Sequence, residues 1–220
     1  MTLIAAIQEK NRVTIMGDTL FREFEPDGSE VLTYRSKFCW AGRDVLYAWA
    51  GYRSSDSAGI SVKSDIGSRA AARLAFDRVA SDHRAAGAAI VTYRPDLKAH
   101  VEADPTPEFL AVTLGGQFGP ELVRMTDRGE ECARNGQILS VGPWPDFEAR
   151  WWRNGTSARV RLLDAMAGAI EAQQGRRVAD FPLDVWTLEG NNATHERLTK
   201  EEALAAIEVA KETEAFSAKR

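Results

Sequence analysis

Cysteine is scarce in this sequence, because the 220 residues include only Cys39 and Cys132. Two cysteines are too few for the disulfide framework of a small secreted protein. Together with three scattered histidines they match no familiar spacing of metal ligands. We expect both cysteines to be buried free thiols, and the sequence predicts no metal site and no cofactor.

The chain also lacks the features that lead a protein to a membrane or to nucleic acid. The opening apolar run, residues 1–7, is too short for a signal peptide and has no basic residues before it. The net charge of -4 is spread along the chain, without the basic patch that binding to phosphates requires. These absences predict a cytoplasmic protein with neither a membrane nor a nucleic-acid partner.

Several common catalytic motifs are missing. There is no glycine-rich phosphate loop ending in Lys-Ser or Lys-Thr, no Gly-x-Ser-x-Gly, and no His-Glu-x-x-His. The histidines, His83, His100 and His195, lie among polar residues, which favours surface positions. Catalysis by a histidine-activated nucleophile is therefore not expected.

The composition is that of an ordinary globular protein. Hydrophobic residues make up 44% and charged residues 27%, so neither disorder nor a fibrous structure is indicated. A chain of this length can bury most of its surface in one core. We expect a single domain over residues 1–220.

Short apolar runs separated by turn residues predict two hairpins before any helix. Residues 3–7 should pair with 13–16, and residues 31–40 with 45–50. Residues 18–30 are polar and contain Pro26-Asp27-Gly28, which predicts a loop between the hairpins.

The rest of the chain alternates helices and strands. Apolar residues at helical spacing predict helices over 57–85, with a break near Gly67, and over 146–172, starting again near Thr156. Residues 86–103 fit either a strand or a helix. Strands are expected at 109–114, 122–126, 138–141 and 183–188, and Thr199 and Glu202 form a capping box that opens a last helix. This order predicts sheets packed face to face, with helices outside.

Four residues near the amino terminus carry a family resemblance. Thr2, Asp18, Lys37 and Gly51, with Asp18 sixteen residues after Thr2 and Gly51 fourteen after Lys37, resemble the pattern of proteasome β-subunits and the HslV peptidase. These are N-terminal nucleophile (Ntn) hydrolases. The segment between Asp18 and Lys37 is longer than usual in the family. The resemblance implies an α+β fold, a four-layer αββα sandwich, and a threonine-type endopeptidase.

The resemblance also implies a role for each residue. Thr2, freed by removal of Met1, would attack the substrate, and its own α-amine would act as the base, since an α-amine has a pKa of about 7.7–8.0. Lys37, paired with Asp18, would lower the pKa of that amine. The N–H of Gly51 would bind the oxyanion of the intermediate.

Three further residues complete the expected site. Asp180 is the candidate for a supporting aspartate before the last strand, and Thr19 for a contact to the substrate. Strand alternation places Trp49 on the same face as Gly51. We expect Trp49 to make the pocket shallow, so that small residues are preferred at the cleaved position.

One departure from the family pattern leaves alternatives open. Where active members have Gly-Ser-Gly, this chain has Val141-Gly142-Pro143-Trp144, and Ser140 is shifted. A catalytically inactive scaffold or binding ring, and an Ntn amidohydrolase acting on a small amide, are the rival interpretations. The implied partners are a peptide or unfolded protein substrate, copies of the chain in a homo-oligomeric ring, and an AAA+ unfoldase.

Overall fold

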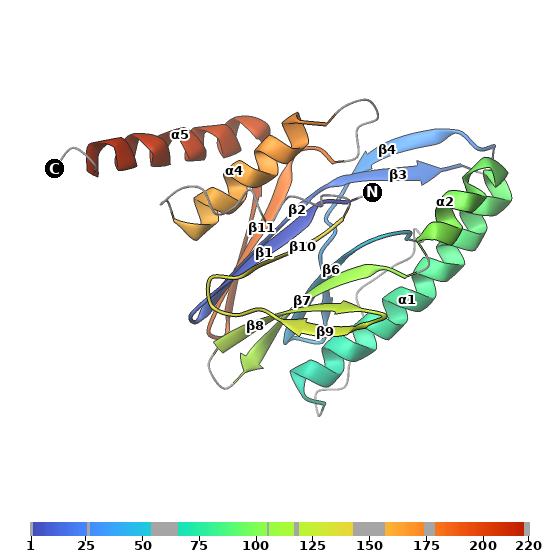
Figure 1. The fold of residues 1–220 in the computed structure, drawn as a ribbon, viewed down its shortest axis with the longest axis horizontal. Coiled ribbons are helices and arrows are strands. Elements are labelled where there is room, and N and C mark those ends of the chain that lie inside the picture. Colours follow the sequence, from blue (N-terminus) through green and yellow to red (C-terminus); the bar gives the residue numbers. More distant parts are fainter. Residues whose placement is uncertain are drawn as a thin grey trace.

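The computed structural model describes residues 2–25, 27–53, 66–104, 106–116, 119–142, 157–173 and 179–217. Their strands form two five-stranded sheets and one two-stranded sheet, and all pairings are antiparallel (Figure 1). The first sheet has the order β10 (Ile138–Val141), β1 (Ile4–Glu9), β2 (Arg12–Asp18), β11 (Leu183–Glu189), β12 (Asn192–Leu198). The second has the order β5 (Cys39–Ala41), β6 (Val45–Ala50), β7 (Glu108–Gly116), β8 (Gly119–Thr126), β9 (Gly129–Cys132). The small sheet pairs β3 (Leu20–Phe24) with β4 (Glu30–Tyr34).

The strand β1 is buried on both faces, as the apolar run at residues 3–7 predicts. Side chains alternate along a strand, so Ile4 and Ala6 enter the core between the two large sheets, together with Leu46 and Leu110 of the second sheet. Ala5 and its neighbours on the other face pack beneath a helix. The predicted hairpin of residues 3–7 and 13–16 is confirmed by the β1–β2 pairing.

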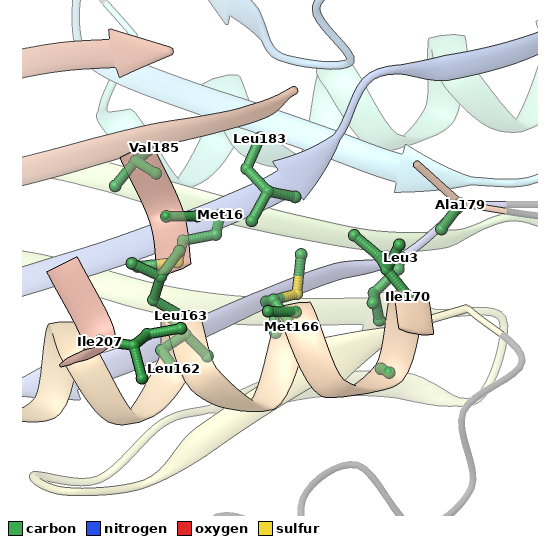
Figure 2. Close-up of a cluster of buried hydrophobic side chains, with 14 of the residues drawn as sticks. Leu3, Met16, Leu162, Leu163, Met166, Ile170, Ala179, Leu183, Val185 and Ile207 are labelled. Carbon is green, nitrogen blue, oxygen red and sulfur yellow. The ribbon is translucent and has the colours of Figure 1, made fainter. Parts of the chain in front are cut away.

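The outer face of the first sheet is covered by α4 (Ala158–Glu171) and part of α5 (Lys200–Ser217). Figure 2 shows Leu3 and Met16, from the sheet side, facing Leu163 and Met166 of α4 in one cluster. The α5 helix adds Ile207 to this cluster and then runs outward beyond the sheet (Figure 1).

The predicted capping box of α5 is confirmed. The amide of Glu202 donates to Thr199 Oγ1 at 3.3 Å, and the amide of Thr199 donates to the carboxylate of Glu202 at 2.8 Å. These two bonds satisfy amide groups that the helix start leaves without an intrahelical acceptor.

The outer face of the second sheet packs on the long helix α1 (Ser68–Tyr93). Tyr47, Trp49 and Phe109 meet Phe76 and Val79 of α1 in one buried cluster. A 3₁₀ turn (Pro95–Leu97) and α2 (Lys98–Ala103) follow, so the ambiguous stretch 86–103 is helical. Among the described helices, none combines the length and the apolar composition that crossing a bilayer needs.

The expected fold class, an α+β four-layer αββα sandwich, has to be corrected. The described structure is mostly antiparallel sheet with four α-helices, and it contains a third sheet that the layer description omits. Residues 18–30 are not a loop, because β3 and β4 form a hairpin around the turn in which Gly28 N–H donates to Glu25 O at 2.8 Å. The expected strand 31–40 is divided between β4 and β5, which lie in different sheets.

The expected helix bounds also change. The helix α1 begins at Ser68, directly after Gly67, and residues 57–65 of the expected helix lie outside the described residues. The helix α4 begins at Ala158, and the expected helical residues 146–156 lie outside them too.

Candidate active site

The centre of the site is a buried ion pair between Lys37 and Asp18. The ammonium of Lys37 lies 2.6 Å from Asp18 Oδ2, and the side chains are 2% and 0% exposed. Asp18 ends β2, whereas Lys37 lies in the irregular segment between β4 and β5 rather than in the expected strand. The ring of Phe38 lies against Gly17, where a Cβ would come within 3.0 Å of it, so glycine allows the two segments to approach.

Asp18 also holds the backbone beside Thr2. Its Oδ1 accepts the amide of Leu3 at 2.7 Å, its Oδ2 accepts the amide of Leu20 at 3.1 Å, and its own amide donates to Leu3 O at 3.1 Å. The Leu3 side chain is anchored in the cluster under α4 (Figure 2). One carboxylate therefore links the amino-terminal backbone to Lys37.

Burial dominates the ionisation of this pair. It lowers the pKa of Lys37, an effect opposed by the attraction and hydrogen bond of Asp18 and reinforced by the charge of Arg53. Burial likewise raises the pKa of Asp18, opposed by Lys37 and by the amides of Leu3 and Leu20. Each charge is thus kept in the interior by the other, and a proton on Lys37 is held less tightly than on a surface lysine.

Thr2, Lys37, Trp49 and Gly51 line one cavity of about 560 Å³. The cavity runs from these residues along β3 and the C-terminal half of α1. Four of the seven predicted site residues therefore meet at one surface, although they come from the chain start, the β4–β5 connection and the end of β6. Asp18 stands behind Lys37, to which it is bonded.

Phe21 of β3, which lines the cavity, makes cation–π contacts with three basic side chains. The charged groups of Arg35, Lys37 and Arg53 lie 4.5, 5.2 and 5.5 Å from its ring centre. The Arg53 guanidinium also lies 4.5 Å above the ring of Trp49. Such contacts are favourable, because the face of an aromatic ring attracts positive charge.

Trp49 lines the cavity but is almost fully buried. It is 5% exposed and stacks on Tyr47, with ring centres 5.9 Å apart. Both belong to the cluster under α1, which agrees with the alternation expected along β6.

Gly51 occupies a position that only glycine fits. Its φ of +141° is rarely adopted by L side chains, and a Cβ there would lie 2.4 Å from Nδ1 of His83. The backbone of Gly51 at the cavity wall is thus in direct contact with α1.

Like Asp18, the predicted residues Thr19 and Asp180 lie outside the cavity lining. The hydroxyl of Thr19, which is fully buried, donates to Pro182 O at 2.9 Å. Asp180 accepts the hydroxyl of Tyr34 at 2.9 Å and the amide of Phe181 at 2.9 Å. Thr19 and Asp180 therefore connect the chain before β11 to the β3–β4 region.

The segment that replaces Gly-Ser-Gly lies beside the amino terminus. Val141 is paired with Ile4, so the chain after it runs toward Thr2. The amide of Gly142 donates to the carboxylate of Glu108 at 2.7 Å, and Ser140 lies within β10, opposite Ala5. Pro143 and Trp144 lie outside the described residues.

The expected burial of three residues was wrong. Cys132 is exposed and Cys39 half-buried, although both are free thiols as expected. His83 is 1% exposed rather than on the surface, whereas His100 and His195 are exposed. The signal for His83 was its place four residues after Val79 on the buried stripe of α1. Within the described residues no cluster of metal-ligand side chains occurs.

No protein-family model and no curated protein matches the chain. Among solved structures it is similar to Anbu from Hyphomicrobium sp. strain MC1, with a TM-score of 0.61 and 14% identity over 99% of this chain and 97% of that one. The Gly-1 mutant of the same Anbu gives a TM-score of 0.58 and 13% identity over the same shares.

These neighbours correct the family resemblance drawn from the motifs. The structures are Anbu rather than a proteasome β-subunit or HslV, and no family model supports membership in either. Motif spacing rests on only a few positions of the chain, so it could not decide the family. At these identities the likeness shows a fold and nothing finer, and that fold is proteasome-like.

Proposed function

We propose that this protein is an amide hydrolase of the peptidase type, with Thr2 as its N-terminal nucleophile. The observation that carries the proposal is the shared cavity, which brings Thr2, Lys37 and Gly51 together although they are far apart in sequence. Asp18 supports it, because this buried carboxylate binds both Lys37 and the backbone amide next to Thr2.

The chemistry begins when Thr2 becomes the first residue. Its α-amine then lies beside its own hydroxyl and takes the hydroxyl proton, while Oγ1 bonds to the carbonyl carbon of the scissile amide. The negative charge that forms on the carbonyl oxygen is stabilised by the N–H of Gly51. The protonated amine gives its proton to the leaving nitrogen, and water then hydrolyses the ester.

Lys37 supplies positive charge without being consumed. Its charge disfavours a proton on the neighbouring α-amine, which lowers the pKa of that amine from about 7.7–8.0 and keeps it a free base. Since burial lowers the pKa of Lys37 itself, Asp18 is needed to keep the ammonium charged.

The remaining predicted residues support this centre. Trp49 limits the pocket on the cavity wall. Thr19 and Asp180 act through the chain before β11, which Thr19 holds at Pro182 O. Glu108, which was not among the predicted residues, accepts the amide of Gly142.

The proposal extends to substrate and assembly. A peptide or an unfolded polypeptide suits a cavity that continues along β3, where an extended chain has room. Copies of the chain would assemble into a ring through contacts between their helices. Light scattering during size-exclusion chromatography would report the number of copies.

A peptide epoxyketone, which needs both the amine and the hydroxyl of an N-terminal threonine, tests the proposal directly. The intact mass should show loss of Met1 and, after treatment, one added probe per chain on the peptide that begins with Thr2. Thr2→Ala should remain unlabelled, whereas Thr14→Ala, a change at another buried threonine, should label normally. A protein that retains Met1, or a mature protein that resists the probe and cleaves no peptide, would refute the enzyme assignment and favour a scaffold.

A further inference from the structure

His83 is a buried histidine that the proposed chemistry does not use. It lies on α1 and is 1% exposed. Its Nδ1 is 2.9 Å from the amide nitrogen of Tyr52, and its Nε2 is 2.8 Å from the carbonyl oxygen of Asp104. Both ring nitrogens are therefore engaged with the backbone of other segments.

The two partners define the tautomer of the ring. A backbone amide can only donate, so Nδ1 accepts from Tyr52 and carries no proton. A backbone carbonyl can only accept, so Nε2 carries the proton and donates it to Asp104 O. The contacts are satisfied together only by the neutral imidazole with its proton on Nε2.

The same ring supports Gly51 from beneath. The position of a Cβ on Gly51 would be 2.4 Å from Nδ1 and 2.7 Å from Cε1 of His83, and 3.5 Å from Pro107 on another side. The next residue is held as well, because the Tyr52 ring lies 5.0 Å from the imidazole, centre to centre, and close to Gly87 of α1.

We propose that His83 is a positioning residue of the site, which holds the Gly51–Tyr52 backbone at the cavity wall through the bond from the Tyr52 amide to Nδ1. This inference rests on the function proposed above, in which Gly51 binds the oxyanion. The hydrogen bond from Tyr52 to His83 fixes the peptide plane between Gly51 and Tyr52, and the imidazole blocks movement of the Gly51 Cα away from the cavity. Because this Cα also ends the preceding peptide, which carries the Gly51 N–H, the position of that N–H is restricted as well. A donor acts in catalysis only when it is already aimed at the developing charge, so His83 sets how well Gly51 can act.

Two substitutions separate this role from simple filling of the core. In His83→Asn, the side-chain oxygen stands as many bonds from Cβ as Nδ1 does and can still accept the Tyr52 amide. In His83→Gln, the side-chain nitrogen corresponds to Nε2 and can still donate to Asp104, but the acceptor for Tyr52 is lost. Both replace a buried ring by a neutral amide of similar polarity, so each is the control for the other.

The first measurement is hydrogen exchange at the Tyr52 amide. His83→Asn should keep its protection, and His83→Gln should lose it by at least about tenfold, because only the first variant keeps an acceptor. Equal protection in the two variants would overturn the inference, whatever their activity.

The second measurement is peptide hydrolysis. Removal of an oxyanion donor lowers kcat by about 10²–10³-fold, so a displaced donor in His83→Gln should cost roughly 10–100-fold in kcat, with KM changed little. His83→Asn should stay within about threefold of the unsubstituted protein, because the acceptor for Tyr52 is retained. Equal kcat losses in the two variants would show that the ring only fills space, and would overturn the inference.

The inference and the proposed function fail in different ways. If the unsubstituted protein neither labels at Thr2 nor cleaves peptides, while the exchange difference persists, the enzyme proposal falls and the support of Gly51 by His83 stands. If neither variant folds, the test is the ¹⁵N chemical shifts of the His83 ring in the unsubstituted protein, which report which ring nitrogen carries the proton. A charged imidazolium, or a proton on Nδ1, would overturn the inference.

Discussion

Replacing Lys37 by methionine tests the buried ion pair at the centre of the site. Methionine retains much of the apolar stem of lysine but leaves Asp18 without its cation at 0% exposure. Removing one partner of a buried pair costs about 3–5 kcal/mol, since the other charge stays uncompensated. Asp18 keeps the amides of Leu3 and Leu20 as donors, so we expect a loss near the lower end, about 3 kcal/mol.

The loss should depend on pH in a defined direction. Burial already raises the pKa of Asp18, and Lys37 is the largest influence that opposes it, so the substitution raises this pKa further. A carboxyl group with a raised pKa in the folded state destabilises the fold while it is ionised, and this cost disappears as falling pH protonates it. The stability of Lys37→Met should therefore approach that of the unsubstituted protein as the pH falls through the raised folded pKa of Asp18 toward the unfolded value of about 3.9.

The assay is urea unfolding followed by tryptophan fluorescence at several pH values. Arg12→Met is the matched control, because Arg12 pairs with Glu189 at 2.9 Å but both side chains are nearly half exposed. Loss of such a surface pair should cost less than about 1 kcal/mol. Equal losses in the two variants, or a Lys37→Met loss that grows on acidification, would refute the reasoning about the buried pair.

Two further predictions concern the pocket wall and the far side of the first sheet. Trp49→Ala should open the cavity wall beneath Arg53. We therefore expect kcat/KM for peptides with a large aromatic residue at the cleaved position to rise about tenfold or more relative to peptides with a small residue there. Unchanged selectivity in a series of fluorogenic peptides would exclude this role of Trp49. For Asp184, burial alone would raise the pKa, but hydrogen bonds led by that of Arg197 outweigh it and leave the pKa lowered. The stabilisation from a lowered carboxyl pKa is present above the unfolded value of about 3.9 and is lost as pH falls through the folded value. Arg197→Met should thus cost about 2 kcal/mol at neutral pH and shift acid unfolding to higher pH, and acid unfolding curves that coincide would contradict the assignment.

The sequence predicted most of the local structure. The β1–β2 hairpin follows from two apolar runs around a polar turn, and the start of α5 follows from Thr199 and Glu202. Hydrophobic spacing also marked the bulk of α1, since its buried residues recur every three to four positions. These features depend on residues close together in the chain, so their pattern is visible without coordinates.

The site was predictable to a lesser extent. The pairing of Lys37 with Asp18, which the family resemblance implied, is confirmed by the buried ion pair. The roles of Thr2 and Gly51 stay predictions, as do those of Thr19 and Asp180, which lie away from the cavity lining. The β3–β4 hairpin was missed, because its turn residues resemble those of an open loop.

By itself the sequence determined the β1–β2 hairpin and most of the amphipathic helices, and it singled out a lysine and an aspartate that require each other. Tertiary structure alone decided that Thr2 and Gly51 share a cavity with Lys37, and that His83 lies beneath Gly51. The physical reason is the distance along the chain over which each interaction acts. Hydrogen-bonding propensity and periodic burial act over a few residues, whereas contacts between β6, α1 and the amino terminus exist only after the two sheets have packed and brought distant segments together.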